Sequence, residues 1–599
     1  MMTNTINLLL RLWRHLSQNR RRQFLLLMCL MLVSTFAEIV SLGAVIPFIG
    51  ILTSPDLVFS HPIASEVILA WGITSAGQLV LPITVAFVLA ALIAGAIRIL
   101  LLWVSTRLAF ASGADLGIEV YTSTLYQPYR VHVARNSSEV ISGITIKVEG
   151  VVFGVLLPLV MLVSSTVLLV TIMLALIIIN PMTASVAAIG FGGSYALITW
   201  MSRKRLNQNS KRIAYEQTQV IKAQQEGLGG IRDVLLDGAQ PFYSYIYRQA
   251  DIPLRKAQGN NAFINASPRF VIEVLGMVLI AALAYNLSLQ DGGIASALPI
   301  LGALALGAQR LLPALQQVYS SWASIAGSYA SLADIIDLLD QPLPLETRQP
   351  DPTPLHFQDA ISFDAVRFRY TINDPWVLDG LSLEIAKGSR VGFVGSTGSG
   401  KTTTLDLLMG LLVPTEGELL VDGQPIRSNL VRAWQQTIAH VPQSIYLADA
   451  TLAENIAFGV LLDNIDMNRV QQVARQAQIA DYIESSPEGY QAYVGEDGIR
   501  LSGGQRQRIG IARALYKQAS VLVFDEATSA LDNATEKLVI DSIDGLNSDL
   551  TILIIAHRLT TVKHCDIIVE LEKGRVVAQG TYEQLLEYSP SFRSMAKKL

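Results

Sequence analysis

Long apolar stretches in the first half of the chain restrict its fold more than any other feature of the sequence. A helix needs about 20 consecutive apolar residues to cross a bilayer. We predict six membrane spans, at residues 24–52, 80–106, 151–179, 182–201, 268–287 and 294–322. Only 16% of all residues are charged, compared with about 25% in an average soluble domain. The sequence therefore excludes a wholly soluble enzyme and an intrinsically disordered protein.

The segment before the first span suits a helix that lies along the membrane surface. Leucines such as Leu8 and Leu12 are interleaved with Arg11 and His15, which is the amphipathic pattern of such a helix. A short charged helical turn is the alternative. Residues 20–22 followed by an apolar run also resemble a signal peptide, but no small-residue cleavage site ends the run, so we expect the span to be retained.

The distribution of Lys and Arg predicts the orientation of the spans, because basic connections stay on the cytoplasmic side. These residues gather at 20–22, 107–149 and 202–269. A multi-pass membrane protein with both termini in the cytoplasm is therefore expected. The polar stretches at 112–150 and 202–267 are long enough to continue the spans as helices beyond the bilayer and to transmit motion.

A proline-rich segment at 341–354 divides the chain, because proline removes backbone donors and blocks helix continuation. We predict a membrane domain at 1–340 and a soluble domain at 355–599. Two cysteines, Cys29 and Cys565, are too few for a disulfide framework or a metal cluster. We expect both to be small buried residues.

The soluble domain contains a glycine-rich motif at 395–402. Its sequence, GSTGSGKT, fits the pattern G-x-x-x-x-G-K-[ST] and lies between an apolar strand and an apolar helical run. Such a loop directs backbone N–H groups at phosphate oxygens, and the following helix adds its positive dipole end. Lys401 would contact the β- and γ-phosphates, and Thr402 would contact Mg²⁺. The candidate nucleotide ligands are Gly395, Ser396, Thr397, Gly398, Ser399, Gly400, Lys401, Thr402 and Thr403.

A second apolar strand, at 521–524, ends in the acidic pair Asp525 and Glu526. Parallel strands bind ligands at their carboxyl ends, so both carboxylates are expected near the phosphate loop. Asp525 suits the coordination shell of Mg²⁺, and Glu526 suits a base that polarises the attacking water.

A third motif lies shortly before this strand and identifies a family. The residues Leu501, Ser502, Gly503, Gly504 and Gln505 resemble the signature motif of ATP-binding cassette (ABC) proteins. Other residues stand in the order found in that family. Tyr370 resembles the aromatic residue that stacks on adenine, Gln443 the Q-loop glutamine, Asp532 the D-loop aspartate and His557 the switch histidine.

With six spans ahead of one cassette, the chain resembles an ABC exporter half-transporter. The resemblance implies a type I exporter fold, in which an α-helical membrane domain precedes an α/β phosphate-loop cassette. It also implies ATP and Mg²⁺ as cofactors. Thr402, Gln443 and Asp525 would hold Mg²⁺, and Gln443, Glu526 and His557 would act in catalysis.

In this family the signature of one cassette closes over the nucleotide held by another, so the resemblance implies a dimer. All motifs are intact, which favours a homodimer, and a heterodimer is the alternative. Residues 126–129 and 236–240 would form short coupling helices that dock on the cassettes. The net charge of −4 provides no basic field that would attract nucleic acid.

Ionisable residues within the spans are the candidate cargo contacts, because charges in a bilayer are costly and usually face a cavity or a partner. Arg98 and Arg310 suit an anionic head group such as a pyrophosphate. Alternatively, these arginines pair with Glu38 or Glu273 in the neighbouring spans, or extend to the membrane surface.

Short patches of the membrane half resemble bacterial flippases of polyprenyl-pyrophosphate-linked oligosaccharides. The patches are residues 36–38, 45–48, 127–139 and 310–313. The resemblance implies ATP-driven movement of a lipid-linked oligosaccharide or a related glycolipid across the bacterial inner membrane. A lipid A or phospholipid flippase and a peptide exporter are the alternatives.

Overall fold

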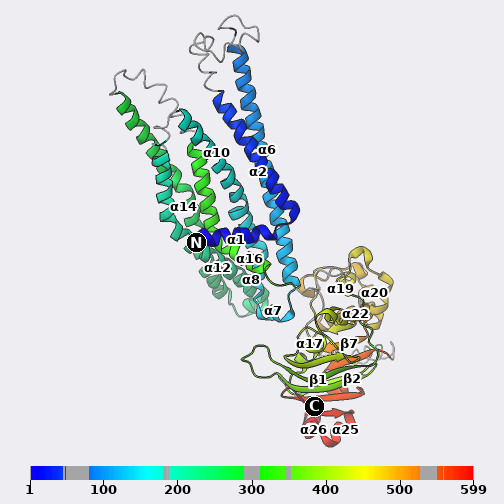
Figure 1. Cartoon of the computed structure of the whole chain (residues 1–599). Helices are drawn as coiled ribbons and strands as arrows, with labels where there is room; N and C mark the ends of the chain where they lie inside the picture. Colours follow the sequence, from blue (N-terminus) through cyan, green and yellow to red (C-terminus); the bar gives the residue numbers. More distant parts are fainter. Residues whose placement is uncertain are drawn as a thin grey trace. The chain divides into compact units, whose positions relative to one another are not determined.

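The chain forms two compact units (Figure 1). The computed structural model describes residues 2–44, 48, 78, 80–179, 185, 188–288, 311–343, 352–525, 538, 549–556 and 559–597. We call Met1–Gln127 with Arg135–Leu343 the helical unit, and Pro128–Ala134 with Pro344–Leu599 the α/β unit.

The helical unit consists of long helices joined by short turns. Its α-helices are α1 (Met2–His15), α2 (Gln18–Gly43), α6 (Val80–Leu125), α8 (Ser137–Ser142), α9 (Val148–Val151), α10 (Leu157–Ile179), α12 (Gly193–Gly229), α13 (Ile231–Leu236), α14 (Gln240–Ser288) and α16 (Tyr329–Leu339). Residues 311–327 are helical as well. Among the described residues, three short π-helical segments interrupt the regular helices: η2 (Gly143–Lys147), η3 (Val152–Leu156) and η4 (Ala188–Gly192).

Three helical stretches of the described residues are long and apolar enough to cross a membrane. They are Gln18–Ser41, Val80–Leu125 and Ser137–Leu174, and they contain most of the first three predicted spans. The predicted span at 182–201 overlaps the start of α12, and the predicted span at 268–287 lies within α14. Residues 294–310 of the last predicted span lie outside the described residues.

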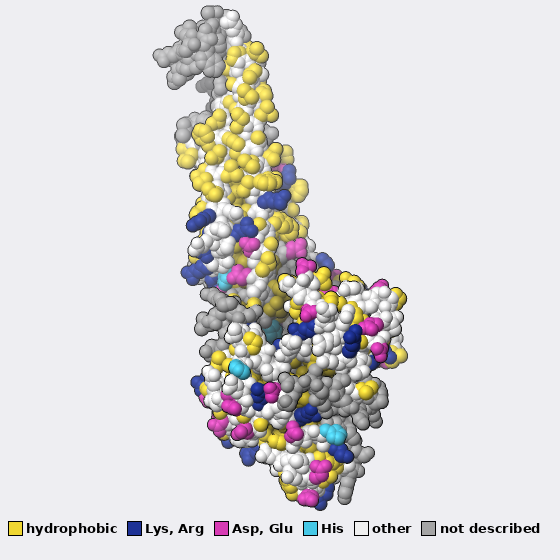
Figure 2. Space-filling view, turned by 90° about the vertical axis from the view of Figure 1, so that its right-hand side faces the viewer, with side chains coloured by type: hydrophobic (Ala, Val, Ile, Leu, Met, Phe, Trp, Pro, Cys, Tyr) yellow, Lys and Arg dark blue, Asp and Glu magenta, His cyan; other side chains and the backbone are white. Residues whose placement is uncertain are grey.

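Apolar side chains cover the outer surface of these stretches. Leu26, Leu92 and Ile99 are 69%, 64% and 71% exposed, and Figure 2 shows that hydrophobic side chains dominate much of the helical unit on that side. Contiguous apolar surface of this extent marks a membrane or protein interface, and the length and composition of these helices favour the membrane. Cys29 is exposed on α2, so the expectation that it is buried is wrong, whereas Cys565 is buried.

Helix α1 packs its leucine face onto protein. Leu8, Leu12 and Leu16 are buried in a cluster with residues of α6, α9 and α16. The amphipathic pattern that suggested a helix on the membrane surface therefore covers neighbouring helices with its apolar side.

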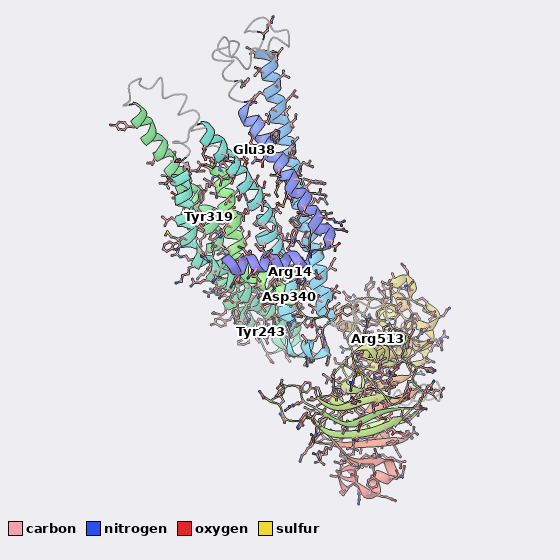
Figure 3. All side chains as sticks on the ribbon, in the orientation of Figure 1. Arg14, Glu38, Tyr243, Tyr319, Asp340 and Arg513 are labelled. Carbon is pink, nitrogen blue, oxygen red and sulfur yellow. The ribbon has the colours of Figure 1, made fainter. Side chains whose placement is uncertain are left out.

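Polar side chains bridge the helices inside this unit. Asn209 on α12 donates to Asn261 on α14 over 2.8 Å, and Asn265 donates to Ser324 over 3.1 Å. The hydroxyl group of Tyr319, which is labelled in Figure 3, donates to the carbonyl oxygen of Ile264 over 3.0 Å. Because these donors and acceptors are satisfied within the bundle, the helices are held in one register.

The described residues of the α/β unit form two sheets. Its strands are β1 (Ala360–Phe368), β2 (Leu378–Ala386), β3 (Arg390–Val394), β4 (Glu416–Val421), β5 (Gln424–Pro425), β6 (Ile438–Val441), β7 (Val521–Asp525), β8 (Thr551–Ile555), β9 (Ile567–Glu572) and β10 (Arg575–Gly580). The first sheet has the antiparallel order β2-β1-β4-β5, and the second has the order β10-β9-β3-β8-β7-β6. In the second sheet all pairs except β9 with β10 are parallel.

Helices cover these sheets and extend the unit. They are α7 (Tyr129–Ala134), α17 (Lys401–Leu408), α18 (Ser428–Gln436), α19 (Leu452–Ile456), α20 (Met467–Gln476), α21 (Ala480–Ser485), α22 (Gly503–Tyr516), α24 (Leu559–Val562), α25 (Tyr582–Tyr588) and α26 (Pro590–Lys597), with the 3₁₀ turns η6 (Leu462–Asn464), η7 (Gly489–Gln491) and η8 (Glu496–Gly498). The interior strands β3 and β7 are apolar and buried along almost their whole length, as expected for parallel strands covered on both faces. Their carboxyl ends meet at one edge of the sheet.

Candidate nucleotide site

The phosphate loop connects the end of β3 to the start of α17 and folds around Lys401. The Lys401 Nζ donates to the carbonyl oxygens of Gly395 and Ser396, over 2.8 and 3.1 Å. This side chain is only 7% exposed. The ammonium group is therefore held inside the loop, at the end of the helix whose dipole favours an anion.

Two glycines permit the close packing of this loop. Gly395 has φ +148°, and a Cβ atom there would collide with the carbonyl oxygen of Leu571 and lie 2.8 Å from Ser399 Oγ. Gly400 has φ +102°, and a Cβ atom would lie 2.6 Å from Leu378 Cδ2. Both positions combine a backbone conformation that favours glycine with a lack of space.

The turn between β9 and β10 supports the loop from behind. The backbone N–H of Gly574 donates to the carbonyl oxygen of Ser399 over 3.0 Å. Sequence reasoning did not identify this support, because the turn lies far along the chain. The signal available was Gly574 itself, which has φ +76° in a tight turn.

One side of the loop is open to solvent. Ser396, Thr397, Gly398 and Thr402 are exposed, whereas Ser399, Lys401 and Thr403 are buried. Ser399 Oγ has no hydrogen-bond partner within the described part of the chain. The exposed residues 396–398 therefore leave one side of the loop accessible to a phosphate ligand.

Asp525 ends β7 and lies on the same sheet edge as the loop, because β8 alone separates β7 from β3. A neighbouring carboxyl group, Asp406 on α17, was not identified from the sequence. Burial, and next the charge of Asp525, raise the pKa of Asp406 to about 6. The carboxyl groups of Asp406 and Asp525 are therefore close enough to interact electrostatically. A charged residue within the buried apolar run of α17 was the signal for Asp406.

The donor set fits Mg²⁺. This ion prefers oxygen ligands and is usually held by one or two carboxylates together with phosphate oxygens and water. Asp525 offers a carboxylate and Thr402 an exposed hydroxyl group. No group of three or more His, Cys, Asp or Glu side chains suited to a metal occurs among the described residues, so a protein-only metal cage is not found there.

The signature motif begins helix α22 with a complete capping box. Ser502 Oγ accepts from the backbone N–H of Gln505 over 3.2 Å, and Gln505 Oε1 accepts from the backbone N–H of Ser502 over 2.8 Å. Ser502 and Gly503 are exposed, Gly504 is half-buried, and Leu501 is buried beneath them. The motif thus presents a helix N-terminus to the outside, which suits an anion.

The remaining residues that the sequence predicted for these sites differ in where they lie. Gln443 is exposed just beyond β6, the strand beside β7. Tyr370 is 53% exposed after β1, with its ring centroid 5.0 Å from that of Phe368. The predicted residues Glu526, Asp532, His557 and Arg310 lie outside the described residues.

Arg98 lies on α6 within the helical unit, far along the chain from the nucleotide site. Its Nη1 is 3.9 Å from Oε1 of Glu38 on α2, and the two side chains are 67% and 15% exposed. The structure thus shows the pairing between these two spans that the sequence left as an alternative.

Comparisons with known proteins agree with this geometry. A family model of the ABC transporter matches residues 378–529. The ATP-dependent lipid A-core flippase of Alkalilimnicola ehrlichii is 33% identical over 421 residues, covering 68% of each chain. The protein of the same name from Saccharophagus degradans is 31% identical over 484 residues, covering 80% of each chain.

A solved structure extends the likeness over nearly the whole chain. The ATP-bound structure of a bacterial Atm1-family ABC exporter superposes with a TM-score of 0.77 at 26% identity, covering 96% of this chain and 98% of that one. Sequence relatives and structural neighbour therefore share both the helical half and the nucleotide-binding half. The chain belongs to the ABC transporter family, as an exporter half-transporter in which a helical membrane domain precedes a cassette that hydrolyses ATP.

Proposed function

We propose that this exporter moves a lipid-linked oligosaccharide or a related glycolipid across the bacterial inner membrane as a homodimer. Two relatives that are named lipid A-core flippases support a lipid cargo. The observation that carries the proposal is Arg98, a cation within an apolar stretch of α6. Its pair with Glu38 spans 3.9 Å and leaves most of the side chain exposed. Its guanidinium group thus has N–H donors available for a phosphate.

A lipid A flippase is the second candidate, and the names of the relatives favour it. Both candidates place a phosphate-bearing head group against the same cation. The identity of the glycan separates them, so the transport assay must compare the two cargoes directly.

The dimer follows from the division of the ATP site between two motifs. Each chain carries one phosphate loop around Lys401 and one signature at Ser502. We propose that the exposed N-terminus of α22 in one chain faces the γ-phosphate held by its partner. ATP then favours the closed pair of cassettes, and loss of the γ-phosphate removes the contacts that stabilise this state.

We assign binding and hydrolysis of ATP to the residues that the sequence motifs predict. Lys401 orients the phosphates and Tyr370 stacks on the base. Thr402, Asp525 and Gln443 would hold Mg²⁺, which neutralises charge on the phosphates. Glu526 takes the proton of the attacking water. His557 orients the γ-phosphate, and Asp532 contributes to the contact between the two cassettes.

Two short helices suit the role of coupling helices, although each lies a few residues from the predicted position. Helix α7 spans Tyr129–Ala134 and groups with the α/β unit. Helix α13 spans Ile231–Leu236, and its Leu235 and Leu236 are 61% and 81% exposed. Exposed apolar residues on a short helix suit docking, and we propose that both helices transmit the motion of the cassettes.

Reconstitution in liposomes tests the function. Fluorescent polyprenyl-pyrophosphate glycan, lipid A, a phospholipid and a peptide are compared for ATP-dependent movement between leaflets. We expect wild-type protein to move the polyprenyl-pyrophosphate glycan between leaflets. The Glu526→Gln variant should bind ATP but hydrolyse it poorly, so it should not move this lipid. Movement of the peptide alone would exclude the proposal, and movement of lipid A alone would establish the second candidate.

The role of Arg98 has a matched control in Arg269 on α14, which is 65% exposed and pairs with Glu273 over 2.8 Å. Arg98→Gln should lower glycan movement about tenfold, because one charge-assisted contact to phosphate is lost. Arg269→Gln should leave it unchanged. Equal transport by both variants would remove Arg98 from the cargo path.

A further inference from the structure

A groove runs between α2 and α6 where the charged start of α2 gives way to its apolar part. Its volume is about 420 Å³. Arg20, Gln23 and Leu27 line it from α2, and Trp103, Arg107 and Leu108 line it from α6. The nucleotide and cargo residues discussed above contribute nothing to its lining.

Along α2 the lining of the groove changes from polar to apolar. On α2, Arg20 and Gln23 precede Leu27 and Leu30, which follow at helical spacing on the same face. On α6, Arg107 and Trp103 are one helical turn apart. A groove with a polar end at the membrane surface and leucines deeper in the bilayer matches a lipid, whose head group is polar and whose chain is apolar.

Arg20 is held in place by its own helix and by α6. Its Nε lies 2.8 Å from Oδ2 of Asp115, and its Nη1 donates to Gln23 Oε1 over 3.0 Å. The charge of this arginine is therefore balanced within the protein. It forms the wall of the groove and still has N–H donors for a further acceptor.

Arg107 supplies the unbalanced charge. Its guanidinium carbon lies 5.7 Å from the centre of the Trp103 ring, and the side chain is exposed. Within the described residues it has no carboxylate partner. The groove therefore carries a net positive charge near one, set beside an aromatic ring of the type common at the membrane surface.

We infer that this groove binds an anionic phospholipid of the surrounding leaflet, with its phosphate between Arg107 and Arg20 and the first part of one acyl chain along Leu27 and Leu30. A single negative charge complements the single unbalanced arginine. Basic pockets between membrane helices are known to hold such head groups. The lining residues of this groove belong to α2 and α6, so the inference can be tested without knowing the cargo.

Lipid retention by the full-length protein tests this inference. Native mass spectrometry in detergent compares phosphatidylglycerol with phosphatidylcholine of identical acyl chains. Wild-type protein should retain the anionic lipid preferentially. Arg107→Gln should lower this retention about tenfold, as expected for loss of a hydrogen bond to a charged group. Arg107→Lys should restore part of it, and Arg22→Gln, an exposed arginine of α2 outside the groove, should retain it fully.

Cross-linking provides a readout on the unmodified protein. Photoactivatable phosphatidylglycerol should label peptides that contain residues 23–30 and 103–111, and excess unlabelled phosphatidylglycerol should suppress the labelling. The inference is overturned if phosphatidylcholine is retained equally, if Arg107→Gln keeps the wild-type preference, or if the label appears only elsewhere.

Discussion

The imidazole Nε2 of His15 lies 2.7 Å from Oδ1 of Asp340, and this contact joins helix α1 to the residue that follows α16. Arg11 Nε donates to the other oxygen of Asp340 over 2.8 Å, and His15 Nδ1 lies 3.3 Å from Glu119 on α6. Asp340 immediately precedes the proline-rich segment. Helix α1 is thus attached to Asp340, which is labelled in Figure 3 and lies near the carboxyl end of the helical unit in the sequence.

The first prediction concerns this attachment. Arg11→Ala should increase backbone hydrogen exchange in α1 about two- to fivefold, because a partly exposed ion pair contributes up to about 1 kcal/mol. Arg14 lies on the same helix, is exposed and makes no ion pair in the described structure, so Arg14→Ala is the control. Exchange measured by mass spectrometry should separate the two variants. Equal rates would show that the leucine face alone holds α1.

The second prediction concerns the backbone at Gly395. Gly395→Ala should weaken ATP binding at least tenfold, since the added Cβ would collide with the Leu571 carbonyl and displace the loop. Gly423→Ala is the matched control, because Gly423 also has positive φ, at +74°, but has open space around it. That change should cost only the conformational strain, about 1 kcal/mol.

Binding of a fluorescent ATP analogue and thermal unfolding measure the two effects separately. If both alanine variants bind the nucleotide equally, close packing at Gly395 has no part in forming the site.

The third prediction concerns the cap of α22. Ser502→Ala should destabilise the cassette by about 1 kcal/mol. It should also lower ATP hydrolysis more than this loss of stability explains, because Ser502 is exposed and in the proposed dimer would contact the nucleotide of the partner. Thr581 and Gln584 form the same capping box at α25. Thr581→Ala should therefore cost similar stability while hydrolysis stays normal. Equal losses of hydrolysis in the two variants would reduce the role of Ser502 to the cap.

The fourth prediction concerns pH. Burial and Asp525 raise the pKa of Asp406 to about 6, so the folded state binds this proton more tightly than the unfolded chain does. Wild-type stability should fall as the pH rises from about 4 toward 6. Asp406→Asn, which stays neutral, should be more stable than wild type at pH 8, by about 1 kcal/mol after solvent screening of this half-buried group.

Thermal unfolding from pH 5 to pH 8, in EDTA and without nucleotide, tests this difference. The advantage of Asp406→Asn should shrink as the pH falls. A difference that is constant with pH would point to packing rather than charge.

Several features of the site could be predicted from sequence because they are local. The glycine and lysine pattern at 395–402 specifies a loop that wraps an ammonium group, and Lys401 indeed donates to Gly395 and Ser396. The three-residue spacing of Ser502 and Gln505 likewise suffices for a capping box. The length of the apolar stretches alone indicated the membrane helices.

Contacts between distant segments depended on tertiary structure. The strand order β3-β8-β7 brings Asp525 within electrostatic range of Asp406. The packing of α2 on α6 pairs Arg98 with Glu38, and the fold brings Asp340 into contact with His15. Spacing along the chain determines structure within a few turns of backbone, so the family, the membrane helices and the nucleotide motifs could be predicted from the residues alone. Only tertiary packing decided which charges pair and which remain exposed, because those distances depend on how separate helices and strands align.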